Sequence, residues 1–246
     1  MNLKQFTWNI VDSNSWLILE GPHGLLIDAV DSEELYEAIE HLASLSIILT
    51  HSHFDHIIGL NRIRAIKPET IVIATKQCSL NIGDIHKNLS STATAFLSFY
   101  EQGRKSNTQI KAFTCTPAQV TFKGAEKVFN WQGHKVELKA VYGHSNDGLV
   151  AFIDQKLLFS GDTLLAVPTV TRFPGGNKKR YQEEDIPLLK SIISKKCYVY
   201  PGHGVASKLV IFKKGVPIKI QPMNKMPTPT GDSALPVVSV EAKGLF

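Results

Sequence analysis

Apolar and polar positions along the chain alternate between a strand-like and a helix-like period, and this pattern predicts a mixed α/β protein. Short apolar, β-prone runs open the chain at residues 5–10, 15–20 and 24–28, with the turn GPHG before the last of them. Residues 32–45 favour a helix, because their apolar side chains recur at helical spacing and Ser32 can cap the first turn. The chain therefore begins with an antiparallel meander followed by a helix.

The next segments alternate between strand and helix. Residues 46–50 and 70–75 are short apolar strands, and residues 57–66 between them have a helical pattern. Residues 76–116 are less regular, with helical pieces expected at 76–87 and 92–102. The aromatic residues between Phe96 and Tyr100 are interpreted as core rather than as the wall of a pocket.

A second β-rich part follows residue 117, where five apolar runs are separated by Gly or Asp turns. A helix at 183–195 and a strand at 198–200 follow it. The order meander, α/β, meander, α/β predicts two sheets packed face to face with helices outside. We expect one domain over residues 1–210 and a proline-rich extension over 211–246, either packed on the domain or partly disordered.

Composition limits which binding partners and which cellular location we expect for the protein. The net charge of +5 is mild and no nucleic-acid module accompanies it, so we expect a small molecule, of anionic character, rather than nucleic acid. Three cysteines without a C-x-x-C pair exclude a disulfide framework. No apolar leader or membrane-length apolar run is present, so a cytoplasmic protein is expected and no membrane partner. A homodimer is left open.

Four potential metal ligands follow the strand at 46–50 within six positions: His51, His53, Asp55 and His56. Residues two apart on an extended segment point to the same side, so the first three can project together. His56 is turned aside as the chain enters a helix. Such a geometry can serve two adjacent metal ions rather than one.

Three further donors also follow β-like runs: His144 after 135–142, Asp162 after 156–160 and His203 after 198–200. Each alone is typical of an ordinary turn residue. Together with the first cluster they supply imidazole and carboxylate donors, which suit zinc, iron or manganese.

These positions in this order resemble the metallo-β-lactamase-fold superfamily, whose H-x-H-x-D-H motif matches residues 51–56. The opening NSWLILEGPHGLLIDAV also resembles the family's first strands, and the likeness spans about residues 10–208. It implies a four-layer αββα sandwich with the metal site at one edge of the two sheets. It also implies the ligand sets: His51, His53 and His144 for one ion, Asp55, His56 and His203 for the second, and Asp162 as the bridge.

Such a set implies a dinuclear metal-dependent hydrolase. Two divalent ions, zinc first with iron or manganese as alternatives, can share a bridging hydroxide and polarise the group under attack. Asp55 and Asp162 are then the expected catalytic carboxylates, and Asp55 can orient the hydroxide. Asp28 is either a partner for a ligand histidine or a simple turn residue.

Residues 157–204 resemble the glyoxalase II-like branch, in which an Arg-containing loop and a P-G-G turn precede P-G-H-G. The resemblance implies hydrolysis of a thioester or a related small ester or lactone, as in hydroxyacylglutathione hydrolases. The chain departs from the branch in GHSNDG (143–148) and DHIIG (55–59). We expect no counterpart of the C-terminal helical domain in the proline-rich residues 215–246, so glutathione recognition is not carried over.

Basic side chains after Asp162 are candidate substrate contacts. Arg172, Lys178 and Lys179 can meet a carboxylate or phosphate of the substrate, or can form a solvent-facing basic loop. Two alternatives to acyl hydrolysis remain: a phosphodiester hydrolase using the same site, and a non-hydrolytic iron-binding redox or sulfur-oxygenase protein. Lactam hydrolysis ranks below them, because a cytoplasmic protein without a secretory signal is expected and the fold by itself does not fix the substrate.

Overall fold

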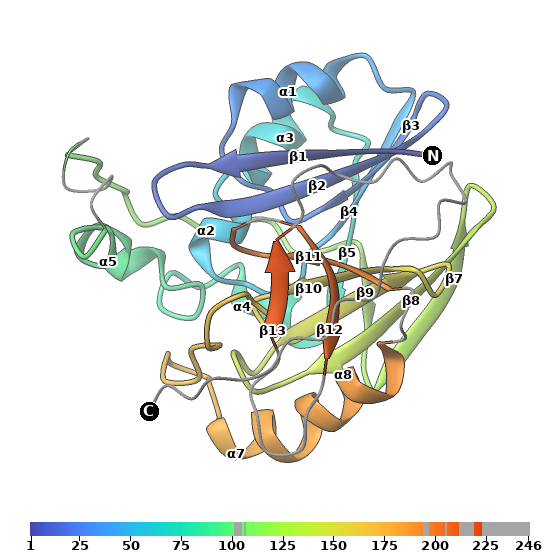
Figure 1. Cartoon of the computed structure of the whole chain (residues 1–246). Helices are drawn as coiled ribbons and strands as arrows, with labels where there is room; N and C mark the ends of the chain where they lie inside the picture. The colour runs from blue at the N-terminus through green and yellow to red at the C-terminus, as the bar shows by residue number, and fades with distance from the viewer. Residues whose placement is uncertain (101–104, 106, 194–196, 205, 212–218, 223–246) are drawn as a thin grey trace.

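Two β-sheets stack face to face in the computed structural model, and helices cover both outer faces (Figure 1). The structure describes residues 1–100, 105, 107–193, 197–204, 206–211 and 219–222. In Figure 1, α1 and α3 lie above the first sheet, and α7 and α8 lie below the second. The predicted αββα order of layers is confirmed.

The first sheet has the strand order β1-β2-β3-β4-β5-β6. Its first three strands form an antiparallel meander, and β3 to β6 pair in parallel. The strands are β1 (Asn2–Trp8), β2 (Ser13–Glu20), β3 (His23–Ile27), β4 (Ser44–Ile48), β5 (Ile71–Thr75) and β6 (Val120–Phe122).

The second sheet has the order β13-β12-β11-β10-β9-β8-β7, and only its β10–β11 pair is parallel among the described strands. Its strands are β7 (Glu126–Trp131), β8 (His134–Val141), β9 (Gly148–Ile153), β10 (Leu157–Gly161), β11 (Tyr198–Pro201), β12 (Ser207–Ile211) and β13 (Lys219–Pro222).

The helices are short. They are α1 (Glu33–Glu40), α2 (Phe54–Ile57), α3 (Leu60–Ile66), α4 (Lys76–Asn81), the 3-10 turn η1 (Ser90–Thr92), α5 (Ala93–Leu97), α7 (Lys178–Arg180), the π-helical turn η2 (Tyr181–Asp185) and α8 (Ile186–Ile192).

Strand periodicity explains why apolar residues fill three separate cores. On β2, Trp16 and Ile18 face the other sheet, whereas Leu17 between them packs against the helices above. On β9, Ala151 belongs to the core between the sheets, and Val150 packs toward α8. Because successive side chains of a strand point to opposite faces, each sheet is buried on both sides. The near-continuous apolar runs in the sequence follow from this arrangement.

Two helices differ from their predicted extents. The helix expected over 32–45 ends at Glu40, and β4 begins at Ser44, because Leu45 belongs to the sheet. The helix expected over 57–66 begins earlier and is split into α2 and α3. Tertiary hydrogen bonds cause the split: Ala29 donates to the His56 carbonyl and accepts from the Gly59 N–H, both at 2.8 Å. Such pairing competes with the helical ladder.

The predicted helix at 183–195 also begins earlier, at Lys178, and passes through the π-helical turn η2 before α8. Pro187 lies in the first turn of α8, where its missing N–H is tolerated. The wider turn of η2 places Asp185 on the inner side of the helix, where it is 2% exposed. This position matters for the site described below.

The proposed extension at 211–246 falls largely outside the described residues, which include only 211 and 219–222 of it. Within that part, β13 pairs with β12 and lengthens the second sheet. None of the helices in the described ranges is long and apolar enough to cross a bilayer.

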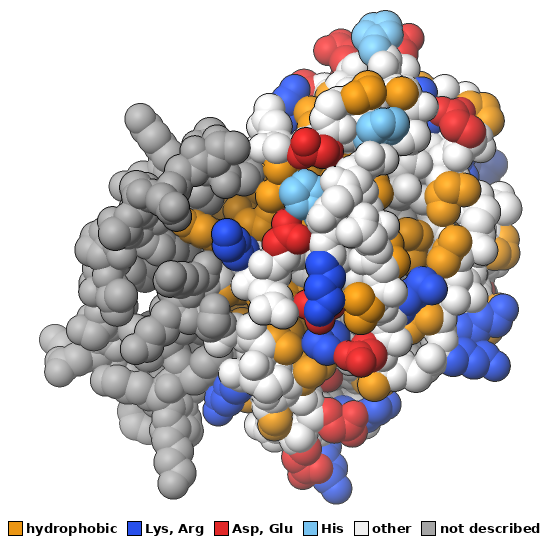
Figure 2. All heavy atoms as spheres, turned by 90° about the vertical axis from the view of Figure 1, so that its right-hand side faces the viewer, with side chains coloured by type: hydrophobic (Ala, Val, Ile, Leu, Met, Phe, Trp, Pro, Cys, Tyr) orange, Lys and Arg blue, Asp and Glu red, His pale blue; other side chains and the backbone are white. Residues whose placement is uncertain are grey.

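Charged side chains of both signs are interspersed on the face remote from α2. Figure 2 shows this face, the right-hand side of Figure 1, with Lys and Arg scattered among Asp and Glu. On this face the net positive charge of the chain is therefore not gathered into one basic patch.

Candidate metal centre

The H-x-H-x-D-H segment begins just beyond the end of β4. His51 and His53 lie on the extended connection, and His53 is the N-terminal flanking residue of α2, with φ −59° and ψ 143°. Asp55 and His56 lie within α2, so the start of this helix turns His56 away from the direction of the preceding residues. All four side chains are buried, with at most 7% exposed. The predicted turn of His56 into a helix is confirmed, but the placement of Asp55 on the extended part is wrong, because Asp55 lies in α2 and groups with His56 and His203 rather than with His51 and His53.

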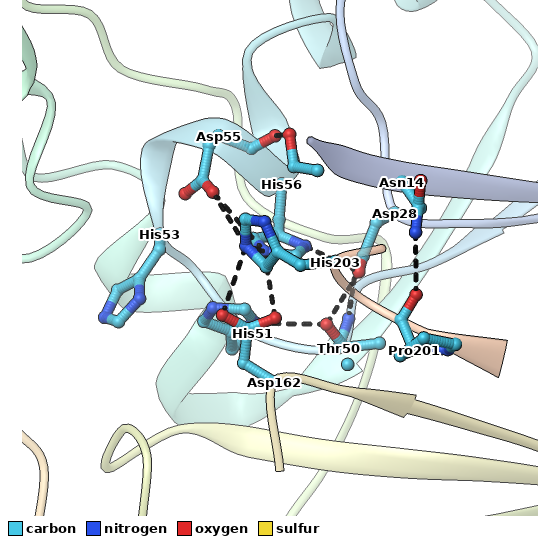
Figure 3. Close-up of polar contacts among 12 residues, drawn as sticks. Asn14, Asp28, Thr50, His51, His53, Asp55, His56, Asp162, Pro201 and His203 are labelled. Atoms are coloured by element: carbon cyan, nitrogen blue, oxygen red, sulfur yellow. Dashed lines mark hydrogen bonds and ion pairs between the residues drawn. The ribbon is translucent and has the colours of Figure 1, made fainter. Parts of the chain in front are cut away.

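The second sheet delivers the other three donors to the same place. His144 lies beyond the end of β8, Asp162 directly follows β10, and His203 lies two residues beyond β11. Figure 3 shows His203 and Asp162 pointing toward the side chains that come from the first sheet. The site therefore lies where the ends of strands from both sheets meet, as the sequence predicted.

Short distances join the seven side chains into one cluster. The Nε2 atom of His203 lies 3.3 Å from both Asp55 Oδ2 and Asp162 Oδ2. The Nε2 atom of His144 lies 3.1 Å from His53 Nδ1 and 3.5 Å from Asp162 Oδ2. Asp162 thus lies between the two sets of ligands.

Three overlapping groups of donors lie close enough to hold metal ions: His51, His53 and His144; His51, His56 and Asp162; Asp55, His56 and His203. Within each group one candidate ligand atom per residue lies within 4.8 Å of the others. His51 Nε2 and Asp162 Oδ1 are buried without a hydrogen-bond partner. Buried polar atoms are rarely left unpaired, so these two atoms fit a site for a cation.

Hydrogen bonds at Nδ1, the ring nitrogen that points away from the cluster, fix the orientation of three of the histidine rings. His56 Nδ1–H donates to Asp28 Oδ2 at 2.9 Å, His144 Nδ1–H to the Val170 carbonyl at 2.7 Å, and His203 Nδ1–H to the Val11 carbonyl at 2.8 Å. Each bond directs Nε2 into the cluster, where its lone pair can bind a metal ion once that nitrogen carries no proton. Such bonds orient metal ligands and raise their basicity.

Asp28 organises the end of β4 as well as His56. Its Oδ1 accepts from the Thr50 N–H and its Oδ2 from the Thr50 hydroxyl, both at 2.7 Å. The Thr50 oxygen lies 3.0 Å from His51 Nδ1, so Asp28 reaches two candidate ligands. Of the two interpretations of Asp28, the one in which it hydrogen-bonds a candidate ligand histidine is confirmed.

Burial and neighbouring charges shift the pKa values of the cluster residues in different directions. Burial, with His144 nearby, lowers the pKa of His53 to about 3, and burial also holds the pKa of His51 well below its usual range. At His56, burial acts in the same direction but is outweighed by the surrounding carboxylates, Asp55 foremost, which raise the pKa to about 10. Burial would raise the pKa of Asp55, but the nearby imidazoles lower it to about 2. In the metal-free protein the carboxylates are therefore ionised at neutral pH.

The P-G-H-G turn is held by residues that the sequence reasoning did not single out. The Asn14 N–H donates to the Gly202 carbonyl at 2.7 Å, and the Asn14 and Trp16 side chains donate to the Pro201 carbonyl at 3.2 and 3.0 Å (Figure 3). A Cβ at Gly202 would collide with Asp162 Oδ1 and lie 2.8 Å from His56 Cε1, so only glycine fits. The polar run SNS at the start of an otherwise apolar strand was the available signal for Asn14.

Asp185 is a second residue missed from the sequence. Its carboxylate accepts from the Tyr142 N–H at 3.0 Å and from the Gly143 N–H at 2.7 Å, immediately before His144. Burial raises the pKa of Asp185, and these two hydrogen bonds oppose the rise. Asp185 therefore anchors the loop that carries His144.

A cavity of about 450 Å³ opens beside the cluster, with His53, Asp55, His144, Asp162 and His203 on its lining. Phe96 and Tyr100 also line the cavity and Phe99 is 78% exposed, so the assignment of this aromatic segment to the core is wrong for Tyr100 and Phe99. Phe96 both lines the cavity and packs on the core above. An aromatic residue in an irregular segment has no periodicity that distinguishes these two environments.

The three predicted substrate contacts lie apart from the described lining of this cavity. Arg172 is exposed in the loop after β10, and Lys178 and Lys179 are exposed on α7. Lys179 lies 4.0 Å from Glu183. Their role in substrate binding stays a prediction.

The sequence of residues 8–203 matches the family model that describes the metallo-β-lactamase superfamily. A hydroxyacylglutathione hydrolase of Aeromonas hydrophila is 26% identical over 67% of this chain, which spans 51% of that relative. The BLEG-1 B3 metallo-β-lactamase structure has a TM-score of 0.68 at 23% identity, covering 83% of this chain and 93% of the other. The structure of TTHA1623 in a di-iron-bound form has a TM-score of 0.62 at 22% identity, covering 83% and 94%.

Proposed function

The chain belongs to the metallo-β-lactamase superfamily, and on that basis we propose that it is a dinuclear metal-dependent hydrolase of a thioester or a related small ester or lactone. The observation that carries the proposal is the cluster of three overlapping donor groups, in which Asp162 lies between the two outer sets. The likeness of residues 157–204 to the glyoxalase II-like branch, and the distant hydroxyacylglutathione hydrolase relative, support acyl hydrolysis.

The residues have distinct roles in this proposal. His51, His53 and His144 would hold one ion, Asp55, His56 and His203 would hold the second, and Asp162, which groups with His51 and His56, would contribute to both. Two bound ions would lower the pKa of a shared water to about 7 and polarise the acyl carbonyl. Zinc is the first candidate for this donor set, with iron or manganese next.

The protein groups orient the reaction without a serine or cysteine nucleophile. Asp55, with a pKa of about 2, remains a carboxylate at neutral pH and can accept a hydrogen bond from the attacking water. Asp28 keeps the proton of His56 on Nδ1, so that Nε2 stays directed into the cluster.

The experiment is a metal-reconstituted activity screen with elemental analysis. Protein loaded with zinc, manganese or iron should hold close to two ions per chain and should hydrolyse at least one member of a panel of a thioester, a lactone and a bis-aryl phosphate. Cleavage of the phosphate alone would replace acyl hydrolysis by phosphodiester hydrolysis. Protein that binds no metal and cleaves none of the three would overturn the proposal.

A matched pair of variants tests the assignment of the site. Asp162→Asn keeps the size of the side chain but removes the bridging carboxylate, so kcat/KM should fall by roughly a hundredfold or more. His86→Ala alters an exposed histidine outside the cluster and should leave kcat/KM unchanged. Equal losses in the two variants would contradict the assignment.

A second candidate is a non-hydrolytic iron-binding redox or sulfur-oxygenase protein. The similar structure of TTHA1623 in a di-iron-bound form favours it, and histidine and carboxylate donors accept iron. Protein purified with iron, showing visible absorbance and no hydrolysis in either zinc or iron form, would support this candidate over the first.

A further inference from the structure

The cavity beside the metal cluster has the size of a small-molecule site and touches the reacting atoms directly. Its volume of about 450 Å³ lies within the range of ligand pockets, which is about 300–1,000 Å³. His53, His144 and Asp162 lie on its lining, so a bound molecule in the cavity would present one end to the cluster. The polarity and charge of the other lining residues therefore indicate the chemical character of the rest of the substrate.

Two facing segments make these walls apolar. Phe96 and Tyr100 come from α5 and the turn after it, and Val167 and Phe173 come from the loop after β10. The rings of Phe96 and Phe173 lie 5.6 Å apart, and Phe173 lies 5.7 Å from the ring of His53. A row of neighbouring rings thus runs from Phe96 through Phe173 to His53, a candidate metal ligand.

The mouth of the cavity also exposes apolar side chains to water. Val167 is 64% exposed, Val170 41% and Tyr100 37%. All three line the cavity. Exposed apolar side chains grouped around a pocket, rather than scattered singly, are characteristic of a binding surface. An apolar group that fills the cavity would remove water from them.

The charges on the lining are unsuited to an anionic substrate tail. Among the described residues that line the cavity there is no Lys or Arg, and the acidic Asp12 adds a negative charge outside the metal cluster. On α7, Arg180 is engaged elsewhere: it pairs with Glu184 at 2.7 Å and stacks over the Tyr142 ring. A glutathione or nucleotide portion would find no cationic partner on this lining.

We infer that the substrate is an uncharged thioester, ester or lactone whose acyl group is a medium-length alkyl or aryl chain bound between Phe96 and Phe173. The inference rests on the proposed hydrolase function. In the reaction the acyl C–S or C–O bond breaks, the acyl carbon gains the oxygen of one water, and the leaving sulfur or oxygen takes a proton. No oxidant or further reactant is required.

The test is a chain-length series on the zinc-loaded protein, using neutral N-acetylcysteamine thioesters of acetic, butanoic, hexanoic and octanoic acids. Each methylene buried in the cavity should raise kcat/KM about fourfold, because its transfer from water is favourable by the corresponding free energy. S-octanoylglutathione carries the same acyl group on an anionic leaving group and should be cleaved more slowly than the neutral octanoyl thioester.

Variants at the mouth of the cavity test its location. Val167→Lys and Val167→Glu introduce opposite charges at a largely exposed position, so the fold should tolerate both. Each should lower the ratio of octanoyl to acetyl kcat/KM at least about threefold, by removing apolar contact. Val128→Lys changes an exposed valine on β7, outside the described lining, and should leave the ratio unchanged.

The failure of this inference can be told apart from failure of the proposed function. A flat or falling dependence on chain length, or a preference for the glutathione thioester, overturns the inference while the hydrolase stands. If no acyl compound is cleaved, the proposed function falls, and calorimetry with octanamide and acetamide becomes the test of the cavity. Tighter binding of octanamide, weakened by both Val167 variants, supports the apolar site, and equal binding overturns it.

Discussion

At the scale of single residues, Asp28 links the backbone of the first sheet to the candidate metal ligands. It has a positive φ of 60°, which aspartate and asparagine tolerate better than most residues. From this position its two oxygens reach Thr50 and His56. One carboxylate therefore supports both the end of β4 and a ring in the cluster.

We predict that Asp28→Asn lowers metal affinity by roughly 10- to 100-fold, the usual cost of losing the partner of a ligand histidine. Asparagine keeps the size of the side chain and tolerates the same backbone conformation, so the fold should persist. Competition with a chromophoric chelator measures the affinity.

Asp154→Asn is the matched control for this prediction. Asp154 also has a positive φ, of 50°, and also hydrogen-bonds a histidine, His134, but lies outside the metal-ligand groups. Its substitution should leave metal affinity unchanged. A similar loss in both variants would show a general effect on the fold rather than support of the ligand.

The candidate ligands could be predicted from the sequence because their signal is local. His51, His53 and His56 are clustered, and the remaining donors each follow a readable strand. Asp185 had no such signal, since it lies in a polar helical segment beside two other acidic residues. Only the folded chain shows that this one carboxylate, and not Glu183 or Glu184, turns inward.

At the scale of elements, the ends of strands place the metal-ligand candidates, and a π-helical turn in one helix holds the loop of His144. The π-helical turn η2 directs Asp185 toward the N–H groups of Tyr142 and Gly143. There is no room for a side chain at Gly143, whose Cβ would meet Asp185 and the backbone of Tyr181. Single π-turns inside helices frequently occur at functional sites. Here the turn packs directly against the loop of His144.

We predict that Asp185→Ala lowers the free energy of unfolding by about 1–3 kcal/mol, because two buried N–H groups lose their acceptor. The same change should reduce metal affinity, since the loop before His144 loses its anchor. Chemical denaturation and chelator competition measure the two effects.

Glu184→Ala provides the comparison on the same helix. Glu184 is exposed and pairs with Arg180 at the surface, where ion pairs contribute little to stability. Metal affinity should not change in this variant. If Glu184→Ala and Asp185→Ala behaved alike, the anchoring role of Asp185 would be refuted.

Element types could be predicted more readily than element boundaries. The strands expected in both meanders were found, but β6, expected as the first strand of the second meander, pairs in parallel with β5 and belongs to the first sheet. The helix boundaries at Gly59 and Glu40 could not be predicted, because contacts with Ala29 and with the sheet determine them. Local propensity contains no information on such tertiary partners.

At the scale of the whole molecule, the candidate site joins two sheets that also share an apolar core and hydrogen bonds such as those of Asn14 and Trp16 to Pro201. The first sheet supplies four donors and the second supplies three. The bridge between Ser13 and His203 connects the sheets at the same place. A ligand that binds only this assembled arrangement stabilises the complete fold relative to the unfolded chain.

We predict that zinc at about a thousand times its dissociation constant raises the unfolding temperature by on the order of 10 °C, from a stabilisation of about 4 kcal/mol. Differential scanning fluorimetry with zinc or with chelator measures the shift. A matched titration with magnesium, which prefers oxygen ligands, should give a much smaller shift.

The zinc-induced shift should increase with pH. The pKa of His56 is raised to about 10, so the metal-free protein keeps that proton at neutral pH, and zinc must displace it. The stability that this charged histidine gives the metal-free protein is present below about pH 6.5 and is lost as the pH rises toward 10. The difference in unfolding temperature between the zinc-bound and the metal-free protein therefore widens between about pH 6 and 9. A gap that is independent of pH would contradict this assignment of charge.

The order of the donors along the chain has a consequence for how the protein is made. His51, His53 and His144 form one complete group, whereas the group with Asp55 and His56 lacks a member until His203 has been synthesised. Synthesis proceeds from the N-terminus, so the first group is available to a metal ion before the second. A ribosome-bound chain in which His144 has left the ribosome and His203 has not should thus capture one ion, and the second ion only after His203 has also left the ribosome.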